Sequence, residues 1–461
     1  MNDILSMDTV AAISTAAGEA GIGVIRISGP KAREIALSVF RPGRSAEFSF
    51  RPRYMHYGHI VDPTDGRVLD EALCVFMPGP RSYTGEDVAE IQCHGSYVSL
   101  REILALVIRE GAVPADRGEF TKRAFMNGRL DLAQAEAVMD LISSKSSRGH
   151  EVAMGQVMGS LSGRIGALRA ALLDELVGIS VNMDYPDEDI EQVIYEKLND
   201  SLIAIKAELS TILATANEGR ILREGVGIAL IGRPNVGKSS LMNRFLRSER
   251  SIVTDVPGTT RDTVEESASL RGISVRFVDT AGIRESADPV ERLGVERSRR
   301  ALGEADLLLL LLDEGSGIEE DDLPLLELCR GRSFIAVLNK SDIGSVIRDE
   351  ELAPYGPSAV VRISALSGEG LPELERAVEE TVLGADFTGS EPMISNARHI
   401  ALARKAFDEL NEAVEQISLG SALDLIEINV HAAYDALGEI TGETASDDII
   451  NEVFSRFCLG K

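Results

Sequence analysis

The sequence predicts a multidomain protein with an α+β N-terminal domain, an α-helical central domain and an α/β domain inserted into the helical one. Three observations predict this organisation. Short β-rich runs separated by glycine and proline turns fill about the first 120 residues. Helical periodicity follows, and it returns near the C-terminus. Between the two helical stretches, apolar runs alternate with polar loops, which is typical of a parallel sheet.

We expect the N-terminal domain at residues 1–123, the two parts of the helical domain at residues 124–220 and 383–461, and the inserted domain at residues 221–382. At 461 residues the chain is too long for a single core. Helices before and after one compact domain favour an insertion, and two separate helical bundles are the alternative.

The N-terminal domain contains short β-rich runs and one helical stretch. Its predicted strands are Val10–Ile13, Gly23–Ile27, Ala72–Met77 and Val88–Cys93, and its predicted helix is Leu100–Glu110. The helical domain shows strong helix formers with apolar residues three and four apart. Its predicted helices are Leu130–Asp140 with further stretches to Thr215, then Asn396–Val414 and Ala422–Ile440.

The inserted domain begins with a phosphate-binding pattern. Gly232–Ser239 satisfies G-x-x-x-x-G-K-[ST], and it directly follows the apolar run Val226–Ile231. The glycines let successive backbone N–H groups point at phosphate oxygens, and the following helix adds its positive end. Lys238 is expected to reach the β- and γ-phosphates, and Ser239 to bind Mg²⁺. The pattern therefore predicts a P-loop nucleotide site.

Three later signals, in the order that such a domain requires, identify the base as guanine. Asp279-Thr280-Ala281-Gly282 follows the strand Ser274–Val278 and offers a Mg²⁺ ligand and a γ-phosphate contact. Asn339-Lys340-Ser341-Asp342 follows the strand Ser333–Leu338, and the Asp342 carboxylate accepts from two guanine N–H groups that adenine lacks. Ser364-Ala365-Leu366 follows Ala359–Ile363 and is positioned like the loop whose backbone N–H contacts the guanine oxygen in GTPases. Together these signals resemble the Ras-like small-GTPase superfamily and predict GTP.

The residue that positions the attacking water is not the usual one. Ras-like GTPases place a glutamine after the Asp-x-x-Gly element, and here that position is Ile283. The nearest downstream carboxylates are Glu285, Asp288, Glu291 and Glu296. Some other group must therefore position the water.

The charge that stabilises the leaving phosphate also has more than one candidate source. Thr260 offers a second Mg²⁺ hydroxyl, and Asn235 offers an amide oxygen to a monovalent cation such as K⁺. Arg261 or Arg284 acting as an arginine finger is the competing interpretation, and spacing does not decide between them.

Composition limits the remaining function classes. The net charge of −27 argues against a protein that holds nucleic acid by a broad basic surface. The longest apolar run, near Leu307–Leu312, is far shorter than the roughly 20 residues of a membrane span. The N-terminus lacks an export signal, and Cys74, Cys93, Cys329 and Cys458 lack metal-ligand spacing. We expect a cytoplasmic protein.

Five further motifs extend across the chain: Asp8–Ile13, Gly23–Gly29, Thr84–Asp87, Leu130–Glu136 and Phe457–Lys461. Together with the GTPase elements, they resemble the MnmE (TrmE) tRNA-modification GTPases. The resemblance implies a homodimer formed by the N-terminal domain and a complex, a heterotetramer or larger, with the FAD-containing partner MnmG. It also implies addition of an aminomethyl or carboxymethylaminomethyl group to C5 of the tRNA wobble uridine, with 5-formyl- or methylene-tetrahydrofolate as cofactor.

The resemblance also implies roles for individual residues. Arg26, Glu90 and Lys461 fall on folate-contacting positions, and Arg129 falls where some members have lysine. The implied K⁺ ligands are Asn235, Thr254, Val256 through its carbonyl, and Thr259, and the implied Mg²⁺ ligands are Ser239 and Thr260. Glu291 matches the glutamate that positions the hydrolytic water. The full set expected to contact GTP is Asn235, Val236, Gly237, Lys238, Ser239, Ser240, Thr254, Thr259, Thr260, Asp279, Thr280, Ala281, Gly282, Asn339, Lys340, Asp342, Ser364 and Ala365.

Two alternatives remain open. Cys458 is a candidate nucleophile for chemistry at C5, or equally a packed anchor for the folate-site Lys461. A ribosome-assembly or signalling GTPase that acts only by nucleotide-dependent binding would have much the same nucleotide motifs. Folate binding distinguishes the two functions, because a binding switch has no need of a folate pocket.

Overall fold

The computed structural model describes residues 8–16, 18–43, 48–184, 191–248, 266–278, 305–385, 387 and 392–461. Within these ranges the chain forms two compact units. Unit 1 contains the residues up to Met139 together with Gly438–Lys461, and unit 2 contains the described residues of Asp140–Leu437.

Unit 1 is built on one sheet with the strand order β3-β4-β5-β6-β2-β1-β7. Its strands are β1 Val10–Ile13, β2 Ala20–Ser28, β3 Phe40–Pro42, β4 His56–Val61, β5 Val68–Met77, β6 Val88–Gly95 and β7 Val113–Pro114. Neighbouring strands are antiparallel except β1 and β7, which are parallel. All four predicted strands of this domain are therefore confirmed, although β2 and β5 begin earlier than expected.

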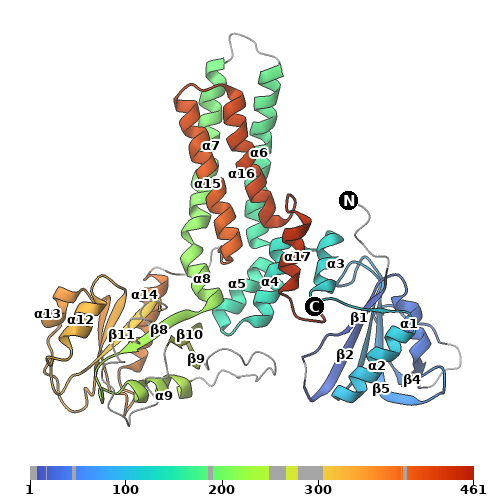
Figure 1. Cartoon of the computed structure of the whole chain (residues 1–461), viewed down its shortest axis with the longest axis horizontal. Helices are drawn as coiled ribbons and strands as arrows, with labels where there is room; N and C mark the ends of the chain where they lie inside the picture. Colours follow the sequence, from blue (N-terminus) through green and yellow to red (C-terminus); the bar gives the residue numbers. More distant parts are fainter. Residues whose placement is uncertain are drawn as a thin grey trace. The chain divides into compact units, whose positions relative to one another are not determined.

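Two helices of unit 1 pack on this sheet, α1 Ala32–Val39 and α2 Tyr97–Arg109 (Figure 1). Helix α2 presents Leu100, Ile103 and Val107, spaced three and four residues apart, to the same core as β2 and β6. The next helix, α3 Glu119–Met126, contacts the C-terminal helix α17 Asp447–Ser455. The expected helix Leu100–Glu110 and the α+β character of this domain are thus confirmed.

Within unit 1, the last residues of the chain pack against its N-terminal part. The Gly118 N–H donates to the carbonyl of Cys458 at 3.4 Å, and the Phe120 N–H donates to the carbonyl of Lys461 at 3.2 Å. Gly460 has a φ of +88°, and a Cβ there would lie 2.1 Å from the carbonyl oxygen of Ile13. Only glycine fits both that backbone conformation and that approach. The local fold therefore fixes where the terminal lysine lies.

Unit 2 contains a second sheet with the strand order β13-β12-β11-β8-β10-β9. Its strands are β8 Val226–Ile231, β9 Glu266–Leu270, β10 Ile273–Val278, β11 Leu307–Asp313, β12 Phe334–Asn339 and β13 Ala359–Ile363. All neighbours are parallel except the hairpin of β9 and β10. The run Leu307–Leu312 is buried throughout, as a strand covered on both faces requires.

Helices cover both faces of this sheet (Figure 1). Its helical elements are α9 Lys238–Ser248, α12 Leu323–Cys329, α13 Asp349–Leu352, the 3-10 turn Ala353–Tyr355 and α14 Leu371–Leu383. Helices α9 and α14 share one core with β8 and β10, and α12 shares the other with β11 and β12. This doubly covered parallel sheet confirms the expected α/β domain.

The other helices form the helical part of the chain. They are α4 Leu132–Ser143, α5 Ser147–Val157, α6 Ser160–Asp184, α7 Glu191–Ala214, α8 Ala216–Glu224, α15 Ala397–Ser418 and α16 Leu423–Thr441. In Figure 1, α6, α7, α15 and α16 run side by side. None of the helices within the described ranges is long and apolar enough to cross a membrane.

The chain segments that precede and follow the α/β domain touch each other. The Ile394 N–H donates to Thr215 Oγ1 at 3.1 Å, and the Gln156 side chain donates to the carbonyl of Met393 at 2.8 Å. Gly219 allows this approach, because a Cβ there would lie 2.2 Å from the carbonyl oxygen of Ile394. This arrangement agrees with the predicted fold class, in which the α/β domain is inserted into a helical one.

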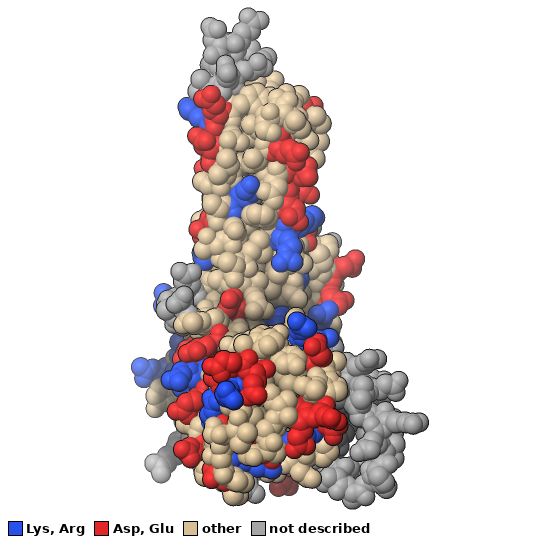
Figure 2. All heavy atoms as spheres, turned by 90° about the vertical axis from the view of Figure 1, so that its left-hand side faces the viewer, with Lys and Arg blue, Asp and Glu red and all other residues tan. Residues whose placement is uncertain are grey.

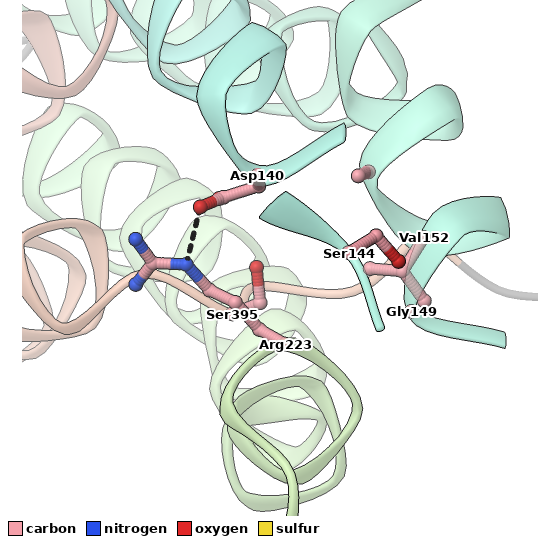
Figure 3. Close-up of a pocket in the computed structure, with 7 residues that line it drawn as sticks. Asp140, Ser144, Gly149, Val152, Arg223 and Ser395 are labelled. Carbon is pink, nitrogen blue, oxygen red and sulfur yellow. Dashed lines mark ion pairs between the residues drawn. The ribbon is translucent and has the colours of Figure 1, made fainter. Parts of the chain in front are cut away.

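A small cavity lies beside the contact between these two chain segments. Figure 3 shows Asp140 and Arg223 pointing toward each other, and Asp140 Oδ1 is 2.9 Å from Arg223 Nε. The cavity measures about 10 Å³ and is lined by Asp140, Ser144, Gly149, Val152, Ala153, Arg223 and Ser395. That is room for about one water molecule, so this cavity is too small for a nucleotide or a folate.

Candidate functional site

The phosphate loop connects the carboxyl end of β8 to the start of α9. Gly237 has a φ of +102°, and a Cβ there would lie 2.1 Å from Asn339 Nδ2. Gly232 is equally constrained, because its Cβ would lie 2.5 Å from the carbonyl oxygen of Leu311. Asn235 adopts a left-handed φ of 65°. The curled backbone that the motif predicts is therefore present, and two of its positions accept only glycine.

Lys238 is held inside this loop by backbone oxygens. Its Nζ donates to the carbonyls of Gly232 at 2.5 Å and Arg233 at 2.7 Å. Burial lowers the pKa of Lys238, since an ammonium with few water contacts is disfavoured. A phosphate oxygen would offset that cost. Ser239 and Ser240, in the first turn of α9, are exposed and accessible to a ligand.

The base-recognition loop is tied directly to the phosphate loop. Asn339, the last residue of β12, is only 2% exposed. Its Nδ2 donates to the carbonyl of Val236 at 2.7 Å, and its Oδ1 accepts from the Ala365 N–H at 2.9 Å. One side chain thus connects the phosphate loop, β12 and the loop after β13. Three separate sequence motifs meet at the carboxyl edge of the sheet, where ligands bind in such folds.

The neighbouring positions complete the rim of this site. Lys340 Nζ donates to Asp313 Oδ2 at 2.6 Å. Burial is the largest single influence and raises the pKa of Asp313, but the hydrogen bond and charge of Lys340, together with backbone hydrogen bonds from Gly315 and Ser316, lower the net pKa. Asp342 is exposed and Ser364 is buried. The Asp342 carboxylate is therefore accessible to a guanine base.

Part of the expected site lies outside the described residues. These positions are Thr254, Val256, Thr259, Thr260, Asp279, Thr280, Ala281, Gly282 and Glu291. The same holds for Arg261, Ile283 and Arg284, on which the choice between a cation and an arginine finger depends.

A second set of predicted residues comes together in unit 1. Arg26 on β2 and Glu90 on β6 are directly opposite in the sheet, and Arg26 Nε lies 2.9 Å from Glu90 Oε1. Burial lowers the pKa of Lys461, and the charge of Arg26 lowers it further, while Glu90 and Cys458 act in the opposite direction. The Phe120 N–H donates to the carbonyl of Lys461 at 3.2 Å, and the Cζ of Arg26 lies 5.5 Å from the Phe120 ring centroid. Phe120 therefore brings Lys461 and the Arg26–Glu90 pair into the same region of unit 1.

Tyr83 connects Arg129 to this set, and sequence analysis missed it because its segment looks like a simple turn. The Cζ of Arg26 lies 4.9 Å from the Tyr83 ring centroid, and the Cζ of Arg129 lies 5.0 Å from it. Arg129 also donates to the Tyr83 carbonyl at 2.8 Å. The Tyr83 hydroxyl is 2.9 Å from Thr121 Oγ1, which fixes the ring.

A larger hollow, open to solvent, lies beside Arg129 in unit 1. It measures about 380 Å³ and is lined by Phe125, Gly128, Arg129, Leu130, Asp131, Gln134, Thr441, Gly442 and Glu443. That volume is within the range of small-molecule sites. Cys458 is exposed near the terminal lysine, whereas Cys74, Cys93 and Cys329 are buried, and all four thiols are free.

A phosphate loop at a helix N-terminus, joined by Asn339 to a base-recognition loop at the carboxyl edge of a parallel sheet, defines a P-loop GTPase. The family model described as the MnmE helical domain matches residues 132–458. The model described as the GTP-binding protein TrmE N-terminus matches residues 9–129.

Full-length relatives give the same result. The tRNA modification GTPase MnmE of Alkaliphilus metalliredigens is 45% identical over 457 residues, which cover 98% of this chain and 99% of that protein. The tRNA modification GTPase MnmE of Bacillus subtilis is 45% identical over 461 residues, 99% of this chain and 100% of that protein. The chain belongs to the MnmE family of tRNA modification GTPases and hydrolyses GTP.

Proposed function

We propose that this GTPase depends on K⁺ and acts with a FAD-containing partner, MnmG. Together they add an aminomethyl or carboxymethylaminomethyl group to C5 of the wobble uridine of certain tRNAs. Tetrahydrofolate, in its 5-formyl or methylene form, donates the one-carbon unit. The observation that carries the proposal is that the Arg26–Glu90 pair and the backbone of Lys461 both lie at Phe120 in unit 1. A GTPase that acts only as a binding switch has no need of such a set.

The chemistry of this set suits a folate. A pterin ring offers N–H donors to a carboxylate such as Glu90, and folate carbonyl and carboxylate oxygens accept from Arg26, Arg129 and Lys461. Lys461 is partly buried beside Arg26, so an acceptor-rich or anionic ligand would relieve the cost of two neighbouring cations. When bound, the folate supplies the one-carbon unit, and these residues hold and orient it.

The described part of the phosphate loop also suits the proposed metal ions. The exposed Ser239 hydroxyl and the exposed Asn235 amide are oxygen donors, which hard cations prefer. We assign Ser239 and Thr260 to Mg²⁺, and Asn235, Thr254, the Val256 carbonyl and Thr259 to K⁺. When bound, the cations neutralise charge that develops on the phosphates. Lys238 contributes its own positive charge, and we assign Glu291 to positioning the water.

The charge of the chain supports sharing the RNA contact with the partner. The net charge is −27, and Figure 2 shows acidic and basic side chains interspersed on the visible face without a continuous basic area. We propose a homodimer formed by the N-terminal domain, joined to MnmG in a heterotetramer or larger complex in the cytoplasm. We propose domain boundaries at residues 1–123, 124–220, 221–382 and 383–461.

Ion dependence tests the assignment to K⁺. We expect GTP hydrolysis by the purified chain to be fast in KCl and slow in NaCl, with Arg284→Ala keeping the K⁺ response. Equal rates in the two salts would contradict the K⁺ site. Loss of hydrolysis in Arg284→Ala, together with equal rates, would support the arginine finger.

Binding of 5-formyltetrahydrofolate to the full chain tests the folate site. We expect the wild type to bind, Lys461→Ala to bind at least about tenfold more weakly, and the surface variant Arg330→Ala to bind as the wild type. A wild type that does not bind folate would favour the binding-switch function. Cys458→Ser distinguishes the two candidate roles of that thiol, a nucleophile or a packed anchor for Lys461. Unchanged tRNA modification by this variant would exclude the nucleophile.

A further inference from the structure

Arg233, the second residue of the phosphate loop, occupies a position that the phosphate-binding motif leaves open, and its side chain contacts another loop of the domain. Its side chain reaches the segment after β11, residues 314–322, which we call the β11 loop. Arg233 donates to Ser316 Oγ at 2.6 Å and forms an ion pair with Glu319. Its Nε lies 3.3 Å from an oxygen of Asp322, whose side chain is 0% exposed. One guanidinium thus contacts three side chains of one loop.

The β11 loop is itself firmly held on its other side. Glu314 is buried, and it accepts from Ser345 Oγ at 2.7 Å and from Arg362 Nε at 2.8 Å. The Glu314 N–H donates to the carbonyl of Asn339 at 2.9 Å. The β11 loop is therefore hydrogen-bonded directly to the base-recognition loop. Arg233 adds a second connection between the phosphate loop and that region, beside the one made by Asn339.

The backbone of Arg233 also has a direct part in placing Lys238. Its carbonyl is one of the two oxygens that accept from Lys238 Nζ. A carbonyl directs the ammonium only if its own residue is held still. The side chain of Arg233 supplies that restraint, because rotation of the peptide would break its contacts with Ser316 and Glu319.

We propose that Arg233 is a positioning residue for the GTPase. Its side chain anchors the phosphate loop to the β11 loop and so holds the carbonyl that aims Lys238 at the nucleotide. The role concerns nucleotide binding more than the chemical step, because Arg233 acts through the loop and Lys238. It does not depend on K⁺, folate or the partner.

The test compares Arg233→Ala, Arg233→Lys, Glu319→Gln and the control Arg330→Ala in the full chain. Arg330 lies on the surface of the same domain and pairs with Glu327 at 3.4 Å. The measurements are the Kd for GDP, kcat and KM for GTP, and the Tm of each nucleotide-free variant. We expect Arg233→Ala to raise the Kd and KM about tenfold, with kcat within about threefold of the wild type.

The conservative variants sharpen the test. Arg233→Lys should recover part of the affinity, because an ammonium can pair with Glu319 but cannot contact three partners as a planar guanidinium does. Glu319→Gln should weaken GDP binding about threefold, and the double variant Arg233→Ala/Glu319→Gln should be little worse than Arg233→Ala alone. Arg330→Ala should bind GDP as the wild type does.

Two outcomes would overturn the proposal. One is a lowered Tm in Arg233→Ala with an unchanged Kd for GDP, which would show a structural role alone. The other is a fall in kcat with unchanged KM. If Arg233→Ala does not fold, unchanged Kd values in both Arg233→Lys and Glu319→Gln would overturn it, and raised values in both would support it.

Discussion

Substitution of Asn339 by alanine should uncouple the phosphate loop from the base-recognition loop. The wild-type side chain donates to the Val236 carbonyl at 2.7 Å and accepts from the Ala365 N–H at 2.9 Å. Val236 is 1% exposed and Ala365 is 8% exposed, so water cannot readily replace either bond. Asn339→Ala therefore leaves two buried backbone groups without a partner.

The size of the effect follows from those two groups. A buried donor or acceptor left unpaired costs about 1–3 kcal/mol, so two cost about 2–6 kcal/mol in all. Part of this cost lowers the stability of the domain. Because both loops are expected to contact the same nucleotide, we expect at least about 1.4 kcal/mol to appear in binding, which is a tenfold rise in Kd.

The assay is titration of the full chain with a fluorescent GDP analogue, with Tm measured in parallel. Asn339→Asp keeps the acceptor for Ala365 but places an oxygen against the Val236 carbonyl, so its loss should be at least as large. Arg330→Ala provides the control. A Kd within twofold of the wild type in folded Asn339→Ala would refute this reasoning. Normal GDP binding by Asn339→Asp would show that the hydrogen bond to the Val236 carbonyl does not contribute to binding.

Three other substitutions test separate parts of the structure. Gly460→Ala places a Cβ 2.1 Å from a backbone oxygen of β1 at a φ of +88°, so the tail should detach and folate binding should fall about tenfold or more; unchanged binding in a titration would contradict this. Lys238→Met should abolish GTP hydrolysis without lowering the Tm of the nucleotide-free chain. Burial lowers the pKa of Lys238 because it disfavours the ammonium form, so removal of this buried amine should not cost stability; a lower Tm would show that its two carbonyl bonds outweigh burial. Hydrogen bonds from Thr64 and then Arg109 lower the pKa of Asp62, and the stability they give is present above the ordinary aspartate pKa and lost as pH falls below it. The Tm of Asp62→Asn should therefore be below that of the wild type near pH 7, with the gap narrowing steadily as pH falls below the ordinary aspartate pKa, and a constant gap would count against that ion pair.

The sequence predicted most of the secondary structure that the described residues show. The strands Val10–Ile13, Val226–Ile231 and Ala359–Ile363 begin and end at the predicted residues. Each is an apolar run closed by glycine or polar residues, so its limits are local. Strand β2 begins at Ala20, earlier than the predicted Gly23, because pairing with β6 extends it through a glycine-rich stretch that has little strand propensity of its own.

The site was predictable where its parts are local motifs. The phosphate loop and the Asn339 loop each consist of consecutive residues, and parallel strands bring their ends to one edge. The contacts of Tyr83 and Arg233 were missed because they join segments far apart in sequence and follow no periodic pattern. Arg233 occupies a variable position of the phosphate-loop motif, so nothing in the motif indicated its partners in the β11 loop.

The central claim is that GTP hydrolysis by this chain drives modification of the tRNA wobble uridine. The most direct measurement is mass spectrometry of tRNA nucleosides from cells that lack the gene and from the same cells complemented with the wild type or with Glu291→Ala. We predict loss of the C5-aminomethyl family of uridines, restored by the wild type and not by Glu291→Ala. A nucleoside profile that is unchanged by loss of the gene would contradict the claim and leave a GTPase that acts as a binding switch.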